Sequence, residues 1–405
     1  GHEVTCVDVD ADKVALINDG QAPIYEPGLE ELLRRNLGRG FRATVDLADA
    51  VTGSDVTMVA VGTPFDGKQI DLSFVQQVSA QIGRAMADKQ SYHVVVVKST
   101  VVPGTTNDVV LPILEKESGK RAGEDFGVGT NPEFLSEGTA VQDFMQPDRI
   151  VLGGIDARTH QTLAKVYAAF EGVPQLETST QAAEMIKYTS NSLLATLISF
   201  SNEIGNLCSA LSVDSAEVFR GVHLSQYLNV PQAAGGRALA SIASFLEAGC
   251  GFGGSCLPKD VAALVRHGQQ RGEGMPLLSS VLDINQRQPA RMLQLLKKHF
   301  TSLEGVRVAV LGTAFKPETD DVRESPALSI IQRLLEERSR VRAYDPIANA
   351  STRRALPNAQ VEYAATLDEA SAEVDAVLLV TRWNEFRALP AKLTSRRPQP
   401  VLIDG

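Results

Sequence analysis

The chain has 405 residues, 43% of them hydrophobic and 22% charged, which is typical of an ordinary globular protein with two or three domains. Its net charge of −10 argues against binding of nucleic acid through the phosphate backbone, and no apolar run approaches the roughly 18 residues of a membrane-spanning helix. The four cysteines are scattered without a CxxC pair or a histidine-rich companion, which argues against disulfides and a metal site and indicates a reducing cytoplasm.

Both ends of the sequence look trimmed. The chain opens with Gly1-His2 directly before a strand-like run, without an initiating methionine, and it closes on a strand followed by Asp404-Gly405. We therefore expect functional residues to be lacking at both ends.

Strands alternate with helices through the first 180 residues. Near-continuous apolar runs predict buried strands at Val4–Val9, Asp55–Val61, His93–Val97 and Ile150–Leu152. Amphipathic stretches between them predict helices at Leu29–Leu37 and Phe74–Met86. Such alternation predicts a parallel sheet that is covered by helices on both faces.

The pattern changes in the middle of the chain. From about Gln181 to Phe300 the sequence is rich in Ala, Leu and Ser and predicts helices, including a long one over Gln181–Leu211. Strands are predicted again at Val306–Leu311, Arg342–Tyr344, Ala376–Val380 and Val401–Ile403.

The N-terminal and C-terminal regions of the chain share sequence patterns. Val4–Asp8 resembles Val341–Asp345, and Asp55–Val61 resembles Asp375–Val380. The predicted fold class is therefore α/β, with two Rossmann-like, doubly wound parallel-sheet domains joined by a central α-helical domain. We expect boundaries at 1–180, 181–300 and 301–405, with the first strand and phosphate loop missing from the first domain and the last domain truncated at its C-terminus.

The stretch Gly251–Asp260, with the sequence GFGGSCLPKD, presents Cys256 behind three glycines. Glycine lets a ligand approach the backbone where a Cβ would clash, and Lys259 is spaced to favour the thiolate, which is the nucleophilic form. A buried thiol beside a Gly-rich turn is the alternative, but the flanking residues favour an activated nucleophile.

Asp8 ends the first predicted strand, where a dinucleotide-binding fold has the carboxylate that bonds the ribose hydroxyls. Asp10 is close enough to compete for this role, and a helix N-cap is the alternative for either residue. Lys13 could lie over the adenine phosphate region, although a solvated helix face is its default.

Three further strand ends are followed by small polar residues, at 61–64, 98–104 and 130–138. Ligands of open α/β sheets bind outside the carboxyl ends of the strands, so these loops are expected to ring one crevice. The helix that follows supplies Glu184, Lys187, Asn191 and Asn202. Lys187 and Asn191 are four apart and share a face, so they could serve an oxyanion or an attacking water, or form a polar stripe at a domain interface.

These motifs together resemble the UDP-glucose/GDP-mannose dehydrogenase family. The resemblance runs in the same order over essentially the whole chain, and its most specific segments are Asn131–Gly138 (NPEFLSEG), Lys187–Asn191 (KYTSN), Gly251–Asp260 and Phe315–Ser325 (FKPETDDVRES). It implies a four-electron oxidation of the C6 hydroxyl of a nucleotide sugar to a carboxylate, with two NAD+ reduced in turn. UDP-glucose is the expected substrate, with GDP-mannose or another UDP-sugar as alternatives.

The resemblance also implies catalytic roles. Cys256 corresponds to the nucleophile that forms a thiohemiacetal and then a thioester, a use of covalent catalysis that divides a hard oxidation into easier steps. Lys187 and Asn191 correspond to donors at the developing oxyanion, and Asp260 to a carboxylate that assists base chemistry or water activation. Glu133 corresponds to an acid–base residue in thioester hydrolysis, and Thr100 to one that positions water near the nicotinamide.

Binding residues carry over in the same way. The cofactor contacts implied are Asp8, Lys13, Thr63, Thr100, Glu137, Lys259 and Arg323. The substrate contacts implied are Glu133, Phe134, Leu135, Lys187, Asn191, Phe245, Leu246, Glu247, Ala248, Gly249, Gly253 and Lys316. Without the resemblance, Arg323 would be interpreted as one half of a surface salt bridge, which contributes little.

The chain also departs from the family pattern. The phosphate-loop glycines are absent, the chain ends at Gly405 before an arginine that usually follows, and the segment 222–244 is longer than expected. This segment contains Arg237, the candidate for an arginine that crosses to a neighbouring subunit. Because the segment precedes the sugar pocket residues, it leaves the identity of the sugar open.

Two other functions fit part of the pattern. A two-electron hydroxyacid dehydrogenase would share the Rossmann domain and a helix lysine but need no nucleophilic cysteine. A non-enzymatic nucleotide sensor would bind the sugar without turnover, which the density of reactive residue types at strand ends argues against. We expect a homodimer through the long central helix, because that helix has more apolar surface than one chain obviously covers.

Overall fold

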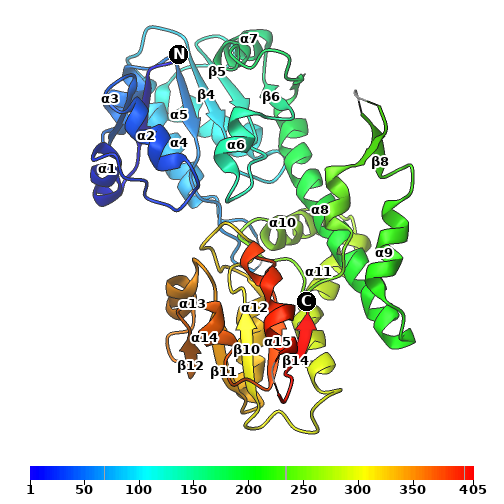
Figure 1. Cartoon of the computed structure of the whole chain (residues 1–405). Helices are drawn as coiled ribbons and strands as arrows, with labels where there is room; N and C mark the ends of the chain where they lie inside the picture. The colour runs from blue at the N-terminus through cyan, green and yellow to red at the C-terminus, as the bar shows by residue number, and fades with distance from the viewer. Residues whose placement is uncertain (68, 233–234, 396) are drawn as a thin grey trace. The chain divides into compact units, whose positions relative to one another are not determined.

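The computed structural model describes residues 1–67, 69–232, 235–395 and 397–405. The chain divides into two compact units, Gly1–Ser190 and Asn191–Gly405, and each is described here by itself. Figure 1 colours the chain from blue at the N-terminus to red at the C-terminus.

Unit 1 is built on parallel strands. A five-stranded sheet has the order β3 (Val56–Val59), β4 (His93–Val97), β5 (Phe126–Thr130), β6 (Ile150–Gly154) and β7 (Gln175–Thr178). A separate two-stranded parallel sheet pairs β1 (Val4–Val7) with β2 (Phe41–Thr44). One pair departs from the predicted parallel sheet, because β5 and β6 run antiparallel.

Helices cover both faces of the five-stranded sheet (Figure 1). The helices of unit 1 are α1 (Ala11–Asn18), α2 (Leu29–Asn36), α3 (Leu47–Thr52), α4 (Ser73–Met86), η1 (Thr106–Val110), α5 (Leu111–Ser118), α6 (Ala140–Met145) and α7 (Ala157–Val166), of which α1 and α2 pack against the β1–β2 pair. The run HVVVV of β4 explains the layering, since successive side chains of a strand point to opposite faces. Val95 and Val97 pack with residues of α4 and α5, whereas Val94 and Val96 pack with Leu163 of α7.

The predicted strands and helices of this unit are confirmed, with ends that coincide or shift by one or two residues. The strand end expected before the 130–138 loop is that of β5 (FGVGT), although its start was not predicted. Two strands were missed. They are β2 (FRAT) and β7 (QLET), and each is four residues long with polar residues in place of a continuous apolar run. Such short segments become strands because they pair with neighbours, which periodicity alone does not reveal.

Unit 2 contains a second α/β sheet, which is parallel throughout. Its strands lie in the order β12 (Val361–Tyr363), β11 (Arg340–Tyr344), β10 (Arg307–Leu311), β13 (Ala376–Leu379) and β14 (Val401–Asp404). One face packs against α11 (Pro276–Leu296) and α12 (Pro326–Glu336), and the other packs against α14 (Leu367–Ser371), η3 (Asn384–Ala388) and α15 (Leu389–Thr394). Helix α13 (Asn349–Ala355) lies between β11 and β12 in the sequence.

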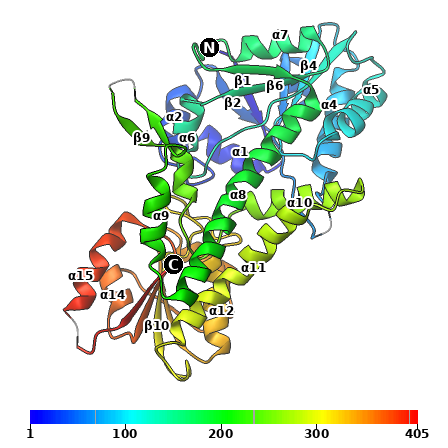
Figure 2. The same ribbon diagram turned by 90° about the vertical axis from the view of Figure 1, so that its right-hand side faces the viewer.

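The rest of the chain is mainly helical, as predicted. The long helix is α8 (Thr180–Leu211), which begins in unit 1 and ends in unit 2, and it is followed by α9 (Ser215–His223), η2 (Ser241–Phe245) and α10 (Leu257–Gln270). Within the segment 222–244 the structure has an antiparallel hairpin of β8 (Asn229–Pro231) and β9 (Arg237–Leu239), which was not predicted (Figure 2). Residues 233–234 of this segment lie outside the described residues.

Arg237 lies on β9 and is exposed. Its guanidinium donates to the main-chain carbonyls of Gln226, at 2.9 Å, and of Asn229. Within its own chain, Arg237 therefore ties the two sides of the hairpin together. In the part of the chain that the structure describes, we find no helix of the length and apolarity required to cross a lipid bilayer.

His93 at the start of β4 is 1% exposed and gives a pH-dependent contribution to stability. Its Nδ1–H donates to the Ser54 carbonyl at 2.9 Å, so Nε2 accepts from the Thr57 hydroxyl at 2.8 Å. Burial, and then the positive charge of Lys89, lower the pKa of His93 from 6.5 to about 4. Between these values the unfolded chain binds the proton and the folded one does not, so acidification favours unfolding.

We expect the free energy of unfolding to fall by roughly 3 kcal/mol from this residue as the pH drops from 6.5 to 4. A His93→Asn variant keeps a donor and an acceptor but does not titrate, so it should lose less stability over the same interval. Urea unfolding at a series of pH values tests this. Equal acid sensitivity of the two proteins would show that His93 does not contribute it.

Candidate functional site

The end of β1 separates the roles of two aspartates. The Asp10 side chain accepts from the main-chain N–H groups of Asp12 and Lys13, so Asp10 is the N-cap of α1. Asp8 accepts from the N–H of Asp10 at 2.9 Å, and its other oxygen lies 3.8 Å from Lys13 Nζ. Because Asp10 caps the helix, the carboxylate of Asp8 stays at the carboxyl end of the strand, with a third of its side chain exposed.

Asp345 occupies in unit 2 the sequence position that corresponds to Asp8, but its role is structural. Asp345, directly after β11, is 1% exposed. Its carboxylate accepts from the indole N–H of Trp383 and from four main-chain N–H groups, those of Thr313, Ala314, Ile347 and Ala348. The repeated sequence thus forms two similar strands, but the carboxylate of Asp345 is hydrogen-bonded to the loops of its own unit.

The loops after β3 and β4 are linked. Thr63 is buried, and its hydroxyl donates to the main-chain oxygen of Thr100 at 2.7 Å. The Ser99 hydroxyl donates to the carbonyl of Val61 at 2.7 Å. These bonds hold small polar residues at the carboxyl ends of adjacent strands, where α/β sheets bind ligands. Together with the carboxylate of Asp8, this edge fits a dinucleotide.

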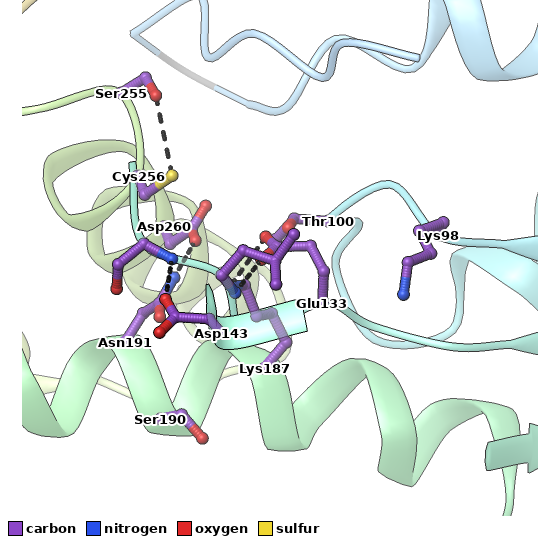
Figure 3. A network of polar contacts seen from close by, with 12 residues as sticks. Lys98, Thr100, Glu133, Asp143, Lys187, Ser190, Asn191, Ser255, Cys256 and Asp260 are labelled. Atoms are coloured by element: carbon purple, nitrogen blue, oxygen red, sulfur yellow. Dashed lines mark hydrogen bonds and ion pairs between the residues drawn. The ribbon is translucent and has the colours of Figure 1, made fainter. Parts of the chain in front are cut away.

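The loop after β5 carries Glu133, Phe134 and Leu135, and Figure 3 shows Glu133 beside Lys187. Glu133 Oε1 forms an ion pair with Lys187 Nζ at 2.9 Å, and Oε2 accepts from the N–H of Leu135 at 2.6 Å. The Phe134 ring lies under the guanidinium of Arg149, 3.9 Å from its centroid, and 5.6 Å from Lys187 Nζ. Lys187 is 4% exposed, so its ammonium is held between a carboxylate and an aromatic face.

Helix α8 also forms hydrogen bonds to the segment that follows Thr100. Glu184, 2% exposed, accepts from the N–H of Gly104 at 2.6 Å and from the N–H and hydroxyl of Thr106 at 2.8 and 2.7 Å. The Thr106 hydroxyl is in turn 2.8 Å from that of Thr130, at the end of β5. Burial raises the pKa of Glu184, and the bonds from Thr106 and Gly104 oppose this. One carboxylate thus joins the helix of Lys187 to two site loops.

In unit 2, Cys256 is exposed at the N-cap position of α10. Pro258 lies in the first turn, where a proline costs no helical hydrogen bond. The Ser255 hydroxyl is 3.7 Å from the Cys256 sulfur (Figure 3). A helix N-terminus favours a nearby negative charge, so this position suits a thiolate.

The glycines before Cys256 are required by contacts inside the chain. A Cβ on Gly253 would lie 2.4 Å from the main-chain oxygen of Glu324, and one on Gly254 would lie 2.8 Å from the Phe315 ring. Gly254 also has a φ of +79°, which other residues rarely adopt. The close approach that Gly253 and Gly254 allow in this structure is therefore that of the 315–324 loop of the same chain.

Asp260 is 1% exposed and has two partners in unit 2. Its Oδ2 accepts from Asn191 Nδ2 at 2.6 Å (Figure 3), and its Oδ1 pairs with Lys259 Nζ at 2.6 Å. Lys259, expected to favour the thiolate, thus has its ion pair with the carboxylate that follows it. Asn191 is fixed as well, which orients its carboxamide.

The remaining predicted binding residues of unit 2 lie on two loops. The segment Phe245–Gly249 begins at the last residue of η2, and the N–H of Gly249 donates to Asn202 Oδ1 at 2.7 Å. Gln288 Nε2 donates to the Gly249 carbonyl at 2.8 Å. On the other loop, Lys316 Nζ is 5.9 Å from the Phe315 ring, and Arg323 pairs with Asp321 at 2.6 Å.

The structure thus brings Lys187 together with Glu133 and Phe134, and Asn191 together with Asp260 and Lys259. Glu137 lies on the loop between β5 and α6, within the same motif as Glu133. Lys98 was not predicted as a site residue, but its Nζ contacts this motif at Asn131. The sequence feature that could have indicated it is a lysine directly after the four valines of a buried strand.

Comparison with known proteins matches the whole chain. Models of the UDP-glucose/GDP-mannose dehydrogenase family match residues 1–171 (NAD binding domain), 181–287 (central domain) and 309–405 (UDP binding domain). A UDP-glucose 6-dehydrogenase from Haloferax volcanii is 44% identical, over 100% of this chain and 91% of that protein. A GDP-mannose 6-dehydrogenase from Pseudomonas putida is 39% identical, over 96% of this chain and 88% of that protein.

Solved structures agree. That of a UDP-glucose dehydrogenase from Pyrobaculum islandicum has a TM-score of 0.89 at 38% identity, covering 100% of this chain and 89% of that one. The residues at the strand ends of unit 1 fit the NAD that the first family model describes. The chain therefore belongs to the UDP-glucose/GDP-mannose dehydrogenase family and is an NAD-dependent nucleotide-sugar dehydrogenase.

Proposed function

We propose that this protein oxidises UDP-glucose to UDP-glucuronate in two successive steps, with Cys256 as the covalent nucleophile. The observation that carries the proposal is an exposed thiol at the N-terminus of α10, followed one turn later by the buried carboxylate of Asp260. A two-electron dehydrogenase needs no such thiol. The first step takes the C6 alcohol to the aldehyde, and the second takes the aldehyde to the acid.

Bound NAD+ would supply the hydride acceptor for each oxidation. The residues of unit 1 proposed to hold it are Asp8 for the ribose, Lys13 for the phosphates, Thr100 near the nicotinamide, and Thr63 and Glu137. From unit 2, Lys259 and Arg323 complete the set. The support for Asp8 is that Asp10 caps α1, so that the Asp8 carboxylate is left to accept from a diol.

The covalent step begins when the Cys256 sulfur attacks the aldehyde carbon. A C–S bond forms, the carbonyl π-electrons move to oxygen, and a proton neutralises the resulting thiohemiacetal. Lys187 and Asn191 are the proposed donors to that oxygen. Both are nearly buried and each has a partner that fixes its direction, which is what electrostatic stabilisation requires.

Removal of hydride from the thiohemiacetal carbon, and of its hydroxyl proton, leaves a thioester. Water then attacks the thioester carbon, the C–S bond breaks, and the carboxylate leaves while the thiol is regenerated. Glu133 is the proposed base for this water, and Thr100 its positioning residue. Asp260, held by Asn191 and Lys259, is proposed to take up protons from the cysteine side.

The sugar is proposed to contact Glu133, Phe134 and Leu135 in unit 1, and the segment 245–249, Gly253 and Lys316 in unit 2. UDP-glucose is favoured because several similar proteins are named UDP-glucose 6-dehydrogenase, among them the relatives from Haloferax volcanii and Rhizobium meliloti. GDP-mannose is the main alternative, since other relatives of similar identity are named for it.

The deciding experiment follows NADH absorbance while the purified protein is offered UDP-glucose, UDP-N-acetylglucosamine, UDP-galactose or GDP-mannose. We expect UDP-glucose to give the highest kcat/KM and two NADH per sugar consumed. One NADH per sugar would contradict the four-electron course. A preference for GDP-mannose with two NADH would correct the substrate but keep the chemistry.

We propose three functional segments, 1–180 for NAD, 181–300 for catalysis and dimerisation, and 301–405 for the nucleotide sugar. They are supported by the three family models, whose matched ranges follow the same order. The reducing cytoplasm is the proposed location, because Cys256 must stay a thiol to react, and all four cysteines are thiols in this structure.

We also propose that the protein is a homodimer through α8. Leu193, Phe200 and Leu207 recur at seven-residue spacing on this helix and are each about half exposed, and Leu211 is 64% exposed. A row of this kind is suited to pack against a second copy of the same helix. The row lies on the part of α8 that belongs to unit 2.

Size-exclusion chromatography with light scattering tests the dimer. We expect the wild-type mass to be twice that of one chain and a Phe200→Glu variant to shift toward the mass of one chain. Leu277→Glu on α11 is the matched control, because Leu277 is 64% exposed but lies outside the row. A monomeric wild-type protein would contradict the dimer and leave the proposed chemistry untouched.

A further inference from the structure

Lys98 follows β4 and has no part in the reaction proposed above. Its side chain is partly buried, and its Nζ donates to Asn131 Oδ1 at 2.9 Å and to the Asn131 main-chain carbonyl at 3.3 Å. Both acceptors belong to the residue that begins the loop of Glu133 and Phe134. A lysine at the end of one strand thus holds the start of the loop that follows the next.

Asn131 is the anchor of that loop. It is 2% exposed, and its Nδ2 donates to the Val151 carbonyl on β6 at 2.9 Å. Its Oδ1 accepts from the Tyr167 hydroxyl as well as from Lys98. Burial raises the pKa of Tyr167 to about 12, so this hydroxyl stays a donor at any working pH. Pro132 comes next and restricts the backbone between the anchor and Glu133.

Three charged or titratable groups face Lys98 from the surrounding elements. Tyr167 shares Asn131 with it, Glu133 attracts its charge, and Lys187 on α8 repels it. Glu133 therefore interacts with two ammonium groups, in direct contact with that of Lys187 at 2.9 Å and at longer range with that of Lys98.

We propose that Lys98 is a positioning residue for the 131–133 turn, which it fixes through Asn131 so that Glu133 is held at its ion pair with Lys187. This inference rests on the proposed function, in which Glu133 accepts a proton from the water that hydrolyses the thioester. A base must be held within hydrogen-bond reach of the proton that it takes up. Lys98 acts on the reaction only through Asn131 and Glu133.

The charge of Lys98 is itself sensitive to pH. Burial, and then the repulsion from Lys187, lower its pKa to about 8, against the attraction of Glu133. Lys98 is therefore charged at neutral pH and loses its charge as the pH rises through about 8. The same protein can then be compared with and without this charge.

The test compares Lys98→Gln, which keeps a donor for Asn131 without the charge, with Lys98→Arg, which keeps the charge. Lys89→Gln is the matched control, because Lys89 Nζ also donates to main-chain carbonyls, those of Thr52 and Ser54, but contacts none of the site residues. Two quantities are measured. They are kcat and KM with UDP-glucose and NAD, and hydrogen–deuterium exchange of the peptide that spans 131–138.

We expect Lys98→Gln to lower kcat about tenfold, with the KM for NAD unchanged. Lys98→Arg should restore most of the wild-type kcat, and Lys89→Gln should leave kcat unchanged. Exchange at 131–138 should increase in Lys98→Gln, and in the wild-type protein when the pH is raised from 7 to 9 after correction for the intrinsic rate.

A kcat of Lys98→Gln within twofold of the wild-type value would overturn the role in the reaction. Unchanged exchange at 131–138 would overturn the positioning role. If neither variant folds, the wild-type comparison between pH 7 and 9 still decides the second point. If only one NADH forms per sugar while exchange at 131–138 responds to Lys98, the proposed function fails and the positioning role stands.

Discussion

Replacing Cys256 with serine is expected to abolish the complete oxidation, with the rate of uronate formation lowered by at least roughly a thousandfold. The serine hydroxyl does not ionise near neutral pH, so no covalent intermediate forms and the second oxidation has no thiohemiacetal to act on. The first oxidation needs no nucleophile. The variant should therefore form at most one NADH per sugar and accumulate material at the aldehyde level.

The measurement is NADH yield per sugar together with mass spectrometry of the intact protein. Cys208→Ala is the control, because Cys208 lies buried on α8 and the variant should keep two NADH per sugar. A thiol reagent should label Cys256, the exposed cysteine of the wild-type protein, before the buried Cys208 and Cys250. Burial raises the pKa of Cys250 to about 12, which protects it further. Two NADH per sugar from Cys256→Ser would show that the reaction does not pass through this sulfur.

Replacing Lys187 with methionine is expected to lower kcat by about a hundredfold to a thousandfold. The ammonium is 4% exposed and paired with Glu133 at 2.9 Å, so methionine removes the proposed oxyanion donor and leaves a carboxylate without its direct counter-ion. The KM for the nucleotide sugar should change far less than kcat, because the donor acts on charge that develops during the reaction.

Steady-state kinetics of Lys187→Met, Glu133→Gln and the double variant measures this effect and the coupling of the pair. We expect strong non-additivity, because the two side chains are in direct contact. Lys297→Met is the control, since Lys297 forms an ion pair with Glu337 at 2.6 Å in which both side chains are more than a third exposed. Such a surface pair contributes little. A kcat for Lys187→Met within a few-fold of wild type would remove Lys187 from the chemistry.

Much of the architecture could be predicted from the sequence, because each apolar run is compatible with only one type of secondary structure. The run HVVVV is buried on both faces, which only a strand between two helical layers allows, and it became β4 with the predicted ends. The long Ala- and Leu-rich stretch became α8 with a start one residue earlier. The family was also recognisable, because its motifs are long and keep their order.

The site was predicted as a set of residues, and the structure supplied the contacts between some of them. Spacing placed Lys187 and Asn191 on one helix face, but it did not show that their partners are Glu133 and Asp260. Those contacts depend on which loops tertiary packing brings to α8. The same holds for Glu184, Lys98 and Asn131, whose importance is visible only in their bonds.

The sequence by itself determined the family, the alternation of strands and helices, and the exposed cysteine of the GFGGSCLPKD motif, because these depend on local pattern. The tertiary structure decided what pattern cannot express. It showed that Asp10 caps α1 while Asp8 remains at the strand end, and that the Asp345 carboxylate is hydrogen-bonded to its own loops. It also showed that Gly253 and Gly254 make room for the 315–324 loop. In each case the role of the residue depends on which neighbour contacts it, and these neighbours are far apart in the sequence or are chosen by the local fold.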